Sequence, residues 1–229
     1  MDRRKFFRNG SLFALGTSLL NPFDLSAATV DFDTLKKNKK AKNIIVVVSD
    51  GMSTGTLNMT DLYLSRKTGV GSNWIQLYKE NKITRALMDM ASASSIVTDS
   101  AAASSSWGGG FRINNGDLNI GPNGEHHVPI WQKFKKAGKM AGCVTTVPIT
   151  HATPAGFCVN SKSRDSQEEI AEQYLELGFD IMMGGGDKYF SSDYRKDKVD
   201  MYQRYTDNGY QVVKTRSEML TAENNQPIL

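Results

Sequence analysis

Short apolar runs and amphipathic segments alternate along this chain, and the alternation constrains its fold more than any other feature. Ile44–Val48 is a continuous run of β-branched residues that ends in Ser49-Asp50-Gly51. Such runs are typical of strands buried on both faces of a parallel sheet. Because apolar runs recur between helical segments, the sequence predicts an α/β fold, a doubly wound and mostly parallel sheet with helices on both faces.

The predicted elements follow from the period of the apolar residues and from the residues that begin each segment. Strands are expected at residues 44–48, 94–98, 141–147, 179–183 and 210–213. Helices are expected at residues 54–67, 129–137 and 193–207, and from Ser100, Thr153 and Ser166 onward. Thr153 before Pro154 has the pattern of an N-cap and first helical residue, and Ser166 with Glu169 predicts a capping box.

Composition excludes several classes of protein. Of the 229 residues, 39% are hydrophobic and 23% are charged, which is ordinary for a globular chain and rules out a disordered or fibrous one. The net charge of +4 is too small and too scattered to indicate a nucleic acid partner. No apolar run approaches the roughly 20 residues that span a bilayer. The 2 cysteines cannot form a disulfide framework.

Residues 1–28 have the order of an export signal. Arg3 and Arg4 precede two phenylalanines, an apolar stretch follows at residues 11–20, and small residues close it at 26–28. The Arg-Arg-x-Phe pattern is similar to a twin-arginine signal, so we expect export to the periplasm or out of the cell. A Sec signal or a basic amphipathic N-terminus is the alternative. Residues 29–42 are rich in lysine, and we interpret them as a solvated linker rather than a nucleic acid patch.

Polar residues follow three of the predicted strands. Asp50 comes after the first, Asp99 and Ser100 after the second, and His151 and Thr153 after the third. In open α/β sheets, ligands bind outside the carboxyl ends of the strands. We therefore expect these side chains to meet there, and their convergence is the main indication of function.

Ser100 and Asp50 each have two interpretations. At a strand-to-helix junction, the Ser100 hydroxyl lies among unpaired backbone N–H groups, a position that binds phosphate and favours the alkoxide of a nucleophile. The simpler interpretation is that Asp99 or Ser100 only caps a helix. A carboxylate such as Asp50 at the end of a buried strand is costly unless it is paired or binds a metal, but it could equally be a turn residue or a helix cap.

The surroundings of Ser100 favour a metal ion as its activator. Ser-His-Asp hydrolases usually carry their serine in Gly-x-Ser-x-Gly, which is absent around Ser100. None of the histidines is a convincing general base for it. Zn²⁺ can hold a serine as its alkoxide and lowers the pKa of a bound water to about 7.

Three blocks of the sequence resemble the alkaline phosphatase family, the metal-dependent type with a serine nucleophile. They are Asn43–Met52, Val97–Trp107 and Thr145–Arg164. The most specific motifs within them are Val-Thr-Asp-Ser-Ala-Ala-Ala-Ser, which starts at Val97, and His-Ala-Thr-Pro-Ala-Gly, which starts at His151. Asp180–Phe190 is a further similar run. The resemblance covers residues 43–229 and implies that they are the N-terminal portion of an alkaline phosphatase-like domain.

Carried over residue by residue, the resemblance implies a site with two Zn²⁺ and one Mg²⁺. Ser100 matches the nucleophile, which is transiently phosphorylated and touches one zinc. Asp50 matches the carboxylate that bridges this zinc and the magnesium, and Thr153 matches a magnesium ligand. Arg164 matches the arginine that clamps the substrate phosphate, and Asp99 matches the residue that helps to orient this arginine.

The histidines fit the family less closely. At the position of His151 some bacterial members have a magnesium-binding aspartate, and others have a histidine that acts through water. A role of His151 near magnesium and a plain loop histidine both stay open. His126 and His127 lie outside the matched blocks, and because neighbouring side chains of a strand face opposite ways, we do not expect them to bind metal together.

The family's remaining zinc and magnesium ligands come later than Leu229, so we expect the N-terminal part of a longer enzyme. A degenerate chain that binds without turnover is the alternative. The 229 residues in isolation are expected to lack a complete sheet, to be marginally stable and to show little or no activity. Cys143 and Cys158 are expected to be buried small apolar residues, although an exported protein permits a disulfide.

The resemblance implies hydrolysis of phosphate monoesters through a phosphoserine. The expected substrates are small-molecule esters, and neither a nucleic acid partner nor a stable membrane span is expected. Family members are often dimers, so a homodimer is one assembly to expect. A phosphodiesterase or sulfatase of the same superfamily is the first alternative. An exported phosphate- or metal-binding protein without turnover is the second.

Overall fold

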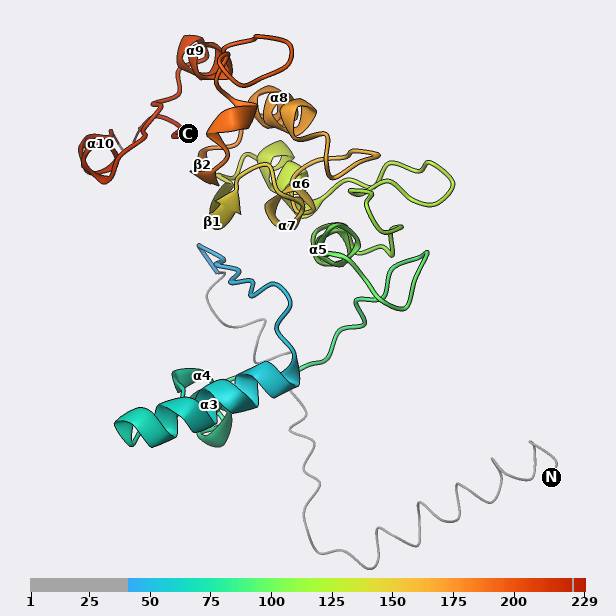
Figure 1. Cartoon of the computed structure of the whole chain (residues 1–229), viewed down its shortest axis with the longest axis vertical. Helices are drawn as coiled ribbons and strands as arrows, with labels where there is room; N and C mark the ends of the chain where they lie inside the picture. The colour runs from blue at the N-terminus through green and yellow to red at the C-terminus, as the bar shows by residue number, and fades with distance from the viewer. Residues whose placement is uncertain (1–40, 224) are drawn as a thin grey trace, which may run out of the picture. The chain divides into compact units, whose positions relative to one another are not determined.

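The computed structural model describes residues 41–223 and 225–229 (Figure 1). The chain divides into two units, residues 1–48 and 49–229. The expected export signal at residues 1–28 and most of the linker at 29–42 lie outside the described residues. Of the helices that residues 41–223 and 225–229 contain, none is both long enough and apolar enough to cross a bilayer.

In the first unit, the described residues 41–48 form neither helix nor strand. The strand predicted at Ile44–Val48 is therefore wrong. β-branched residues favour extended backbone, but a strand exists only where its N–H and C=O groups pair with a neighbouring strand. No described residue forms a ladder with this run, and its side chains are exposed, that of Ile45 to 87%.

The second unit contains a parallel pair of strands, β1 (Gly142–Pro148) and β2 (Ile181–Gly185), which lie side by side in Figure 1. These strands confirm the predictions at 141–147 and 179–183, with slightly shifted ends. The helix α8 (Gln167–Leu177) lies in the connection between them, and parallel strands need such a crossover.

The parallel pairing continues beyond β2 through isolated bridges. Ile181 is bridged to Ile228, and Ile228 is bridged in turn to Gln211. The strand predicted at 210–213 is therefore reduced to bridged pairing with the C-terminal residues. The N–H of Val213 still donates to the carbonyl of Leu229 at 2.8 Å, so the backbone there runs as a short ladder.

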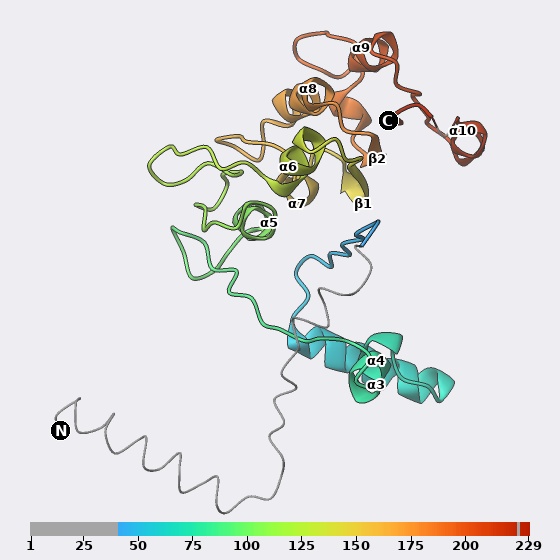
Figure 2. The same ribbon diagram turned by 180° about the vertical axis from the view of Figure 1, so that it is seen from behind.

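Helices make up most of the other regular structure. Besides α8, the described helices are α3 (Thr54–Thr68), α4 (Asn73–Lys79), α5 (Ser100–Gly109), α6 (Ile130–Lys136), α7 (Ala152–Ala155), α9 (Met201–Asp207), α10 (Arg216–Thr221) and the 3-10 helix η1 (Asp187–Tyr189). The predictions at 54–67, from Ser100 and at 129–137 are confirmed. Asp61 of α3 accepts the N–H of Ser72, the N-cap of α4, at 2.7 Å. The two helices accordingly lie side by side in both views (Figures 1 and 2).

The strand predicted at residues 94–98 is not formed, because serine side chains satisfy the backbone locally. The hydroxyl of Ser92 accepts the N–H groups of Ser94 at 3.1 Å and of Ser95 at 2.9 Å. Such local bonds compete with a sheet ladder. The segment that leads into α5 is therefore bent rather than paired.

The helix predicted at 193–207 is only half correct, because α9 begins at Met201. Arg195 is fully buried and donates to the side chains of Glu172 and Asp197 and to the carbonyl of Tyr189. These bonds hold the preceding residues as a compact loop. Lys198 then has a φ of 60°, which ends any right-handed helical path.

Two predicted helix caps are also wrong. The helix α7 begins at Ala152, so His151 and not Thr153 occupies the N-cap position, and Cys158 lies beyond its end. Ser166 does occupy the N-cap position of α8, which confirms the predicted helix start, but its side chain makes no capping bond, so the predicted capping box is not formed. A capping box does form at α10, between Thr215 and Glu218, where the sequence had not predicted one.

The core of the second unit contains buried tyrosines whose hydroxyl groups donate hydrogen bonds to backbone carbonyls. Tyr174 of α8 donates to Ile149 at 3.0 Å, and Tyr205 of α9 donates to Ala171 at 2.9 Å. Both cysteines are free thiols. Cys158 is fully buried, as expected, while Cys143 is half-buried and its burial raises the pKa of the thiol to about 11.

Candidate active site

Asp99 determines how α5 begins. Its backbone is extended, with φ −96° and ψ 175°, and its Oδ1 accepts the N–H of Ala102 at 2.9 Å. This is N-cap geometry, so the simpler interpretation of Asp99 is correct. It is also incomplete, because the second carboxylate oxygen of Asp99 lies 3.1 Å from Nη1 of Arg164. The cap places Ser100 as the first residue of the helix.

Small residues allow α5 and α7 to cross in close contact. A Cβ atom added at Gly108 would lie 2.3 Å from the carbonyl oxygen of Gly156. A Cβ atom added at Gly156 would lie 2.0 Å from Oγ of Ser104. The hydroxyl of Ser104 in turn donates to the carbonyl of Ala152 at 2.9 Å, which ties the two helices together. The crossing therefore brings the N-terminal ends of both helices together.

Asp50 joins the two helices through hydroxyl groups. Its Oδ2 accepts a hydrogen bond from Oγ of Ser100 at 2.8 Å and another from Oγ1 of Thr153 at 3.1 Å. Gly51, with φ 68°, provides the left-handed turn that follows the carboxylate. The structure thus brings together the residues that the sequence placed after three predicted strands, although only one of those strands is formed.

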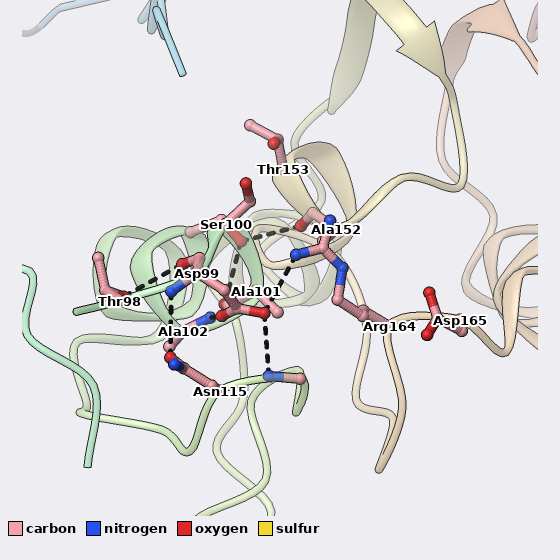
Figure 3. A network of polar contacts seen from close by, with 12 residues as sticks. Thr98, Asp99, Ser100, Ala101, Ala102, Asn115, Ala152, Thr153, Arg164 and Asp165 are labelled. Atoms are coloured by element: carbon pink, nitrogen blue, oxygen red, sulfur yellow. Dashed lines mark hydrogen bonds and ion pairs between the residues drawn. The ribbon is translucent and has the colours of Figure 1, made fainter. Parts of the chain in front are cut away.

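Arg164 reaches the start of α5 beside Asp99 (Figure 3). Its Nη1 pairs with Oδ2 of Asp99 at 3.1 Å, and its Nη2 lies 3.2 Å from Nε2 of His151. Its main-chain N–H donates to the carbonyl of Gly116 at 2.7 Å. A guanidinium held from several directions is a rigid, planar donor for an anion.

His151 lies between Arg164 and Thr153. Burial is the main cause that lowers the pKa of His151, and the positive charge of Arg164 lowers it further, while Asp50 and Asp165 act in the opposite direction. Nδ1 of His151 accepts the N–H of Thr153 at 3.4 Å, the capping bond of α7, and also lies 3.4 Å from Oγ1 of Thr153, while Nε2 lies 3.2 Å from Nη2 of Arg164. His151 thus contacts two other predicted site residues, Arg164 and Thr153.

His126 and His127 are elsewhere. His126 forms an antiparallel bridge with Ile120, and the ring of His127 stacks on Phe111 with centroids 3.8 Å apart. In the described ranges, no three side chains of the types His, Cys, Asp and Glu come close enough to hold a metal ion.

The oxygen atoms gathered at the site suit Mg²⁺ better than Zn²⁺. Asp50, Ser100 and Thr153 offer a carboxylate and two hydroxyl oxygens around one point. Oxygen ligands of this kind fit a hard cation such as Mg²⁺. Zinc sites use histidine, cysteine and carboxylate ligands in tetrahedral sets, and the part of the chain that the structure describes does not assemble one.

The sequence did not single out Asn115 and Gly116, yet both contact the site. The N–H of Gly116 donates to Oδ2 of Asp99 at 3.0 Å, and Oδ1 of Asn115 accepts the N–H of Asp99 at 3.1 Å. The only local signal for them is the Asn-Gly pair, which is a turn signature and carries no chemistry.

The fold and the site define an α/β protein with a serine, a carboxylate and an arginine gathered where helices begin beside a parallel strand. The family model described as alkaline phosphatase matches residues 41–229. The chain belongs to the alkaline phosphatase family.

Individual relatives agree. The chain is 30% identical to alkaline phosphatase 4 of Bacillus subtilis over 202 residues, which is 83% of this chain and 42% of the relative. It is 32% identical to the alkaline phosphatase of Schizosaccharomyces pombe, over 84% of this chain and 38% of the relative. The crystal structure of Thermus thermophilus alkaline phosphatase superposes with a TM-score of 0.72 at 35% identity, over 78% of this chain and 37% of that one.

The cold-active alkaline phosphatase of a Shewanella species superposes with a TM-score of 0.69 at 25% identity, over 80% of this chain and 44% of that one. These neighbours confirm the predicted α/β fold class. The chain spans less than half the length of the relatives that it matches.

The crossing of α5 and α7 gives a prediction about stability. Gly108→Ala forces backbone atoms apart because the new Cβ meets Gly156 at 2.3 Å and the Cα of Phe157 at 2.7 Å. The free energy of unfolding, measured by urea denaturation, should fall by about 1–3 kcal/mol. Gly55→Ala is the matched control, since its Cβ would meet only Ser53 at an ordinary 3.4 Å. Equal stability of the two variants would contradict the close crossing.

Proposed function

We propose that this chain contributes the nucleophile and the phosphate-binding side of an enzyme that hydrolyses phosphate monoesters through a phosphoserine at Ser100. The observation that carries the proposal is the shared carboxylate oxygen of Asp50, which accepts bonds from Ser100 and Thr153. Membership of the alkaline phosphatase family supports it. The matched part of the chain covers only 42% and 38% of two alkaline phosphatase relatives. The complete activity is therefore proposed for a protein of their full length.

Arg164 and the start of α5 would bind the phosphoryl group. The guanidinium fork matches two phosphoryl oxygens, and its pairing with Asp99 fixes its direction. The first turn of α5, a helix of 10 residues, adds backbone N–H groups and the positive end of its dipole beside Ser100. The two donors hold the phosphorus atom in reach of Oγ of Ser100.

The reaction has two displacements. Oγ of Ser100 loses its proton and forms a bond to phosphorus, while the ester oxygen leaves with its electron pair and takes up one proton to become the alcohol. Asp50, as the acceptor of the Ser100 hydroxyl, holds Oγ with its lone pairs directed away from that carboxylate. Water then attacks the phosphoserine, which releases inorganic phosphate and restores the serine. His151 keeps Arg164 and Thr153 in place as a neutral ring.

The family resemblance adds two Zn²⁺ and one Mg²⁺ to this proposal. Asp50 and Thr153 would hold the magnesium, and Asp50 and Ser100 would contribute to one zinc, with further ligands that are not among the described residues. A bound divalent cation supplies positive charge that favours the serine alkoxide and offsets charge on the phosphoryl oxygens. A role of His151 near magnesium, through water as the resemblance implies, belongs to the same proposal.

Export and assembly are proposals as well. The twin-arginine-like segment at residues 1–28 would deliver the protein to the periplasm or the outside of the cell, ahead of a linker at 29–42 and the catalytic portion from 43. Sequencing the N-terminus of the protein purified from its own cells tests this, since an intact residue 1 would contradict removal of a signal. The expected assembly is a homodimer, and the expected substrates are small-molecule esters.

Ser100→Ala tests the nucleophile. In the protein purified from its own cells, the variant should lose more than about 99% of the hydrolysis of a phosphate monoester, because no other oxygen occupies the position of Oγ. Ser106→Ala, on the same helix and bonded only to backbone carbonyls, is the control. The unsubstituted protein should cleave a monoester faster than a diester or a sulfate ester. A reversed order would favour the phosphodiesterase or sulfatase, and binding of phosphate without any release of alcohol would favour the non-catalytic binder.

Arg164→Ala tests the phosphate clamp. Loss of charge-assisted bonds to two oxygens should raise the inhibition constant of inorganic phosphate by about 10- to 100-fold. Lys162→Ala removes the same charge from an exposed residue two positions away and is the matched control. An inhibition constant that rises equally in both variants would show that general charge, and not the position of Arg164, determines binding.

A further inference from the structure

The turn formed by Asn115 and Gly116 lies in the connection between α5 and α6, outside every motif that the sequence emphasised. Gly116 adopts φ 88°, a conformation that glycine accepts without strain. The side chain of Asn115 is exposed and faces the segment that leads into α5 (Figure 3). An exposed amide contributes little to the packing of a core, so core packing does not explain the hydrogen bonds that Asn115 makes.

The amide of Asn115 bonds to the backbone on both sides of Thr98. Its Nδ2 donates to the carbonyl of Val97 at 2.9 Å, and its Oδ1 accepts the N–H of Asp99 at 3.1 Å. One side chain therefore supplies the donor and the acceptor that a neighbouring strand would supply. This segment is not part of any described strand, so these two bonds, together with the bond from the N–H of Val97 to Oγ of Ser95 at 3.1 Å, hold its direction as it enters α5.

The turn itself is anchored independently. The N–H of Asn115 donates to Oγ of Ser94 at 3.0 Å. Gly116 contacts both members of the phosphate-binding pair, because its N–H donates to Oδ2 of Asp99 at 3.0 Å and its carbonyl accepts the N–H of Arg164 at 2.7 Å. The two residues thus connect the start of α5 to the main chain of the arginine.

We infer that Asn115 is a positioning residue for Ser100, which sets the direction of the backbone that presents the nucleophile to the phosphoryl group held by Arg164. The inference rests on the proposed function of Ser100. Asn115 touches neither the substrate nor the reacting atoms, and it acts through Val97 and Asp99. A nucleophile displaced by a fraction of an ångström loses rate more than affinity.

The test compares Asn115→Leu with Asn114→Leu in the protein purified from its own cells. Leucine keeps the bulk of the amide and removes its polar atoms. Asn114 is the matched control, because it precedes Asn115 in the same turn and its amide reaches only Asp117, at 3.5 Å. Asn115→Gln keeps the amide on a longer stem and measures rescue. Each variant is assayed for kcat, KM, inhibition by inorganic phosphate and hydrogen exchange at the amide of Asp99.

Asn115→Leu should lower kcat by about 10-fold while KM and the inhibition constant of phosphate change by less than about 3-fold, as expected when placement and not binding is lost. The Asp99 amide should exchange faster in this variant alone. Asn114→Leu should stay within about 2-fold of the unsubstituted protein, and Asn115→Gln should recover part of the loss.

Two results overturn the inference and leave the proposed function standing. One is a kcat in Asn115→Leu equal to that in Asn114→Leu. The other is a loss of activity that follows the loss of unfolding free energy equally in all variants. Absence of monoester hydrolysis in the unsubstituted protein overturns the proposed function, and the inference falls with it.

Discussion

A single carboxylate oxygen on Asp50 accepts hydrogen bonds from two hydroxyl groups that come from distant parts of the chain. Ser100 and Thr153 are 50 and 103 residues away from it. Asp50 is exposed, and hydrogen bonds that water can replace contribute only about 0.5–1.5 kcal/mol each. Such bonds are too weak to assemble the site by themselves. They form because other parts of the fold already hold the two hydroxyl groups close together.

The crossing of α5 and α7 is what sets that position. Glycines at the contact let backbone approach backbone, and Ser104 adds a bond from one helix to the other. Buried, close-packed contacts of this kind resist displacement, because any added volume must move main chain. Ser100 is the first residue of α5 and Thr153 is the second residue of α7, so the rigidity of the crossing passes directly to their hydroxyl groups. The distance between Oγ of Ser100 and Oγ1 of Thr153 is therefore set by the crossing of the two helices.

The sequence predicted the fold class, both strands of the parallel pair and the convergence at the site, because these depend on local pattern and on the geometry of α/β sheets. It also posed Asp99 as either a cap or a functional residue. The structure shows that one carboxylate does both, with one oxygen on the N–H of Ala102 and the other facing Arg164. Two interpretations of one residue need not exclude each other when its atoms have different partners.

The sequence predictions that failed share a cause. The pairing of strands and the contacts between distant residues leave no local signal in the sequence. Ile44–Val48 has strong strand propensity and no partner strand among the described residues. The loop before α9 follows from the burial of Arg195, which hydropathy ranks as a surface residue. Asn115 has the sequence of an ordinary turn, and its bonds to Val97 and Asp99 depend on how the connection folds back. No spacing rule could have found these contacts.

The most direct test of Ser100 as the nucleophile is to find where the phosphoryl group resides during turnover. The protein purified from its own cells is mixed with a phosphate monoester, quenched in acid, digested and sequenced by mass spectrometry. The phosphoryl group is expected on Ser100, in the peptide that begins α5. A phosphoryl group on any other residue, or steady turnover with no phosphorylated peptide, would contradict it.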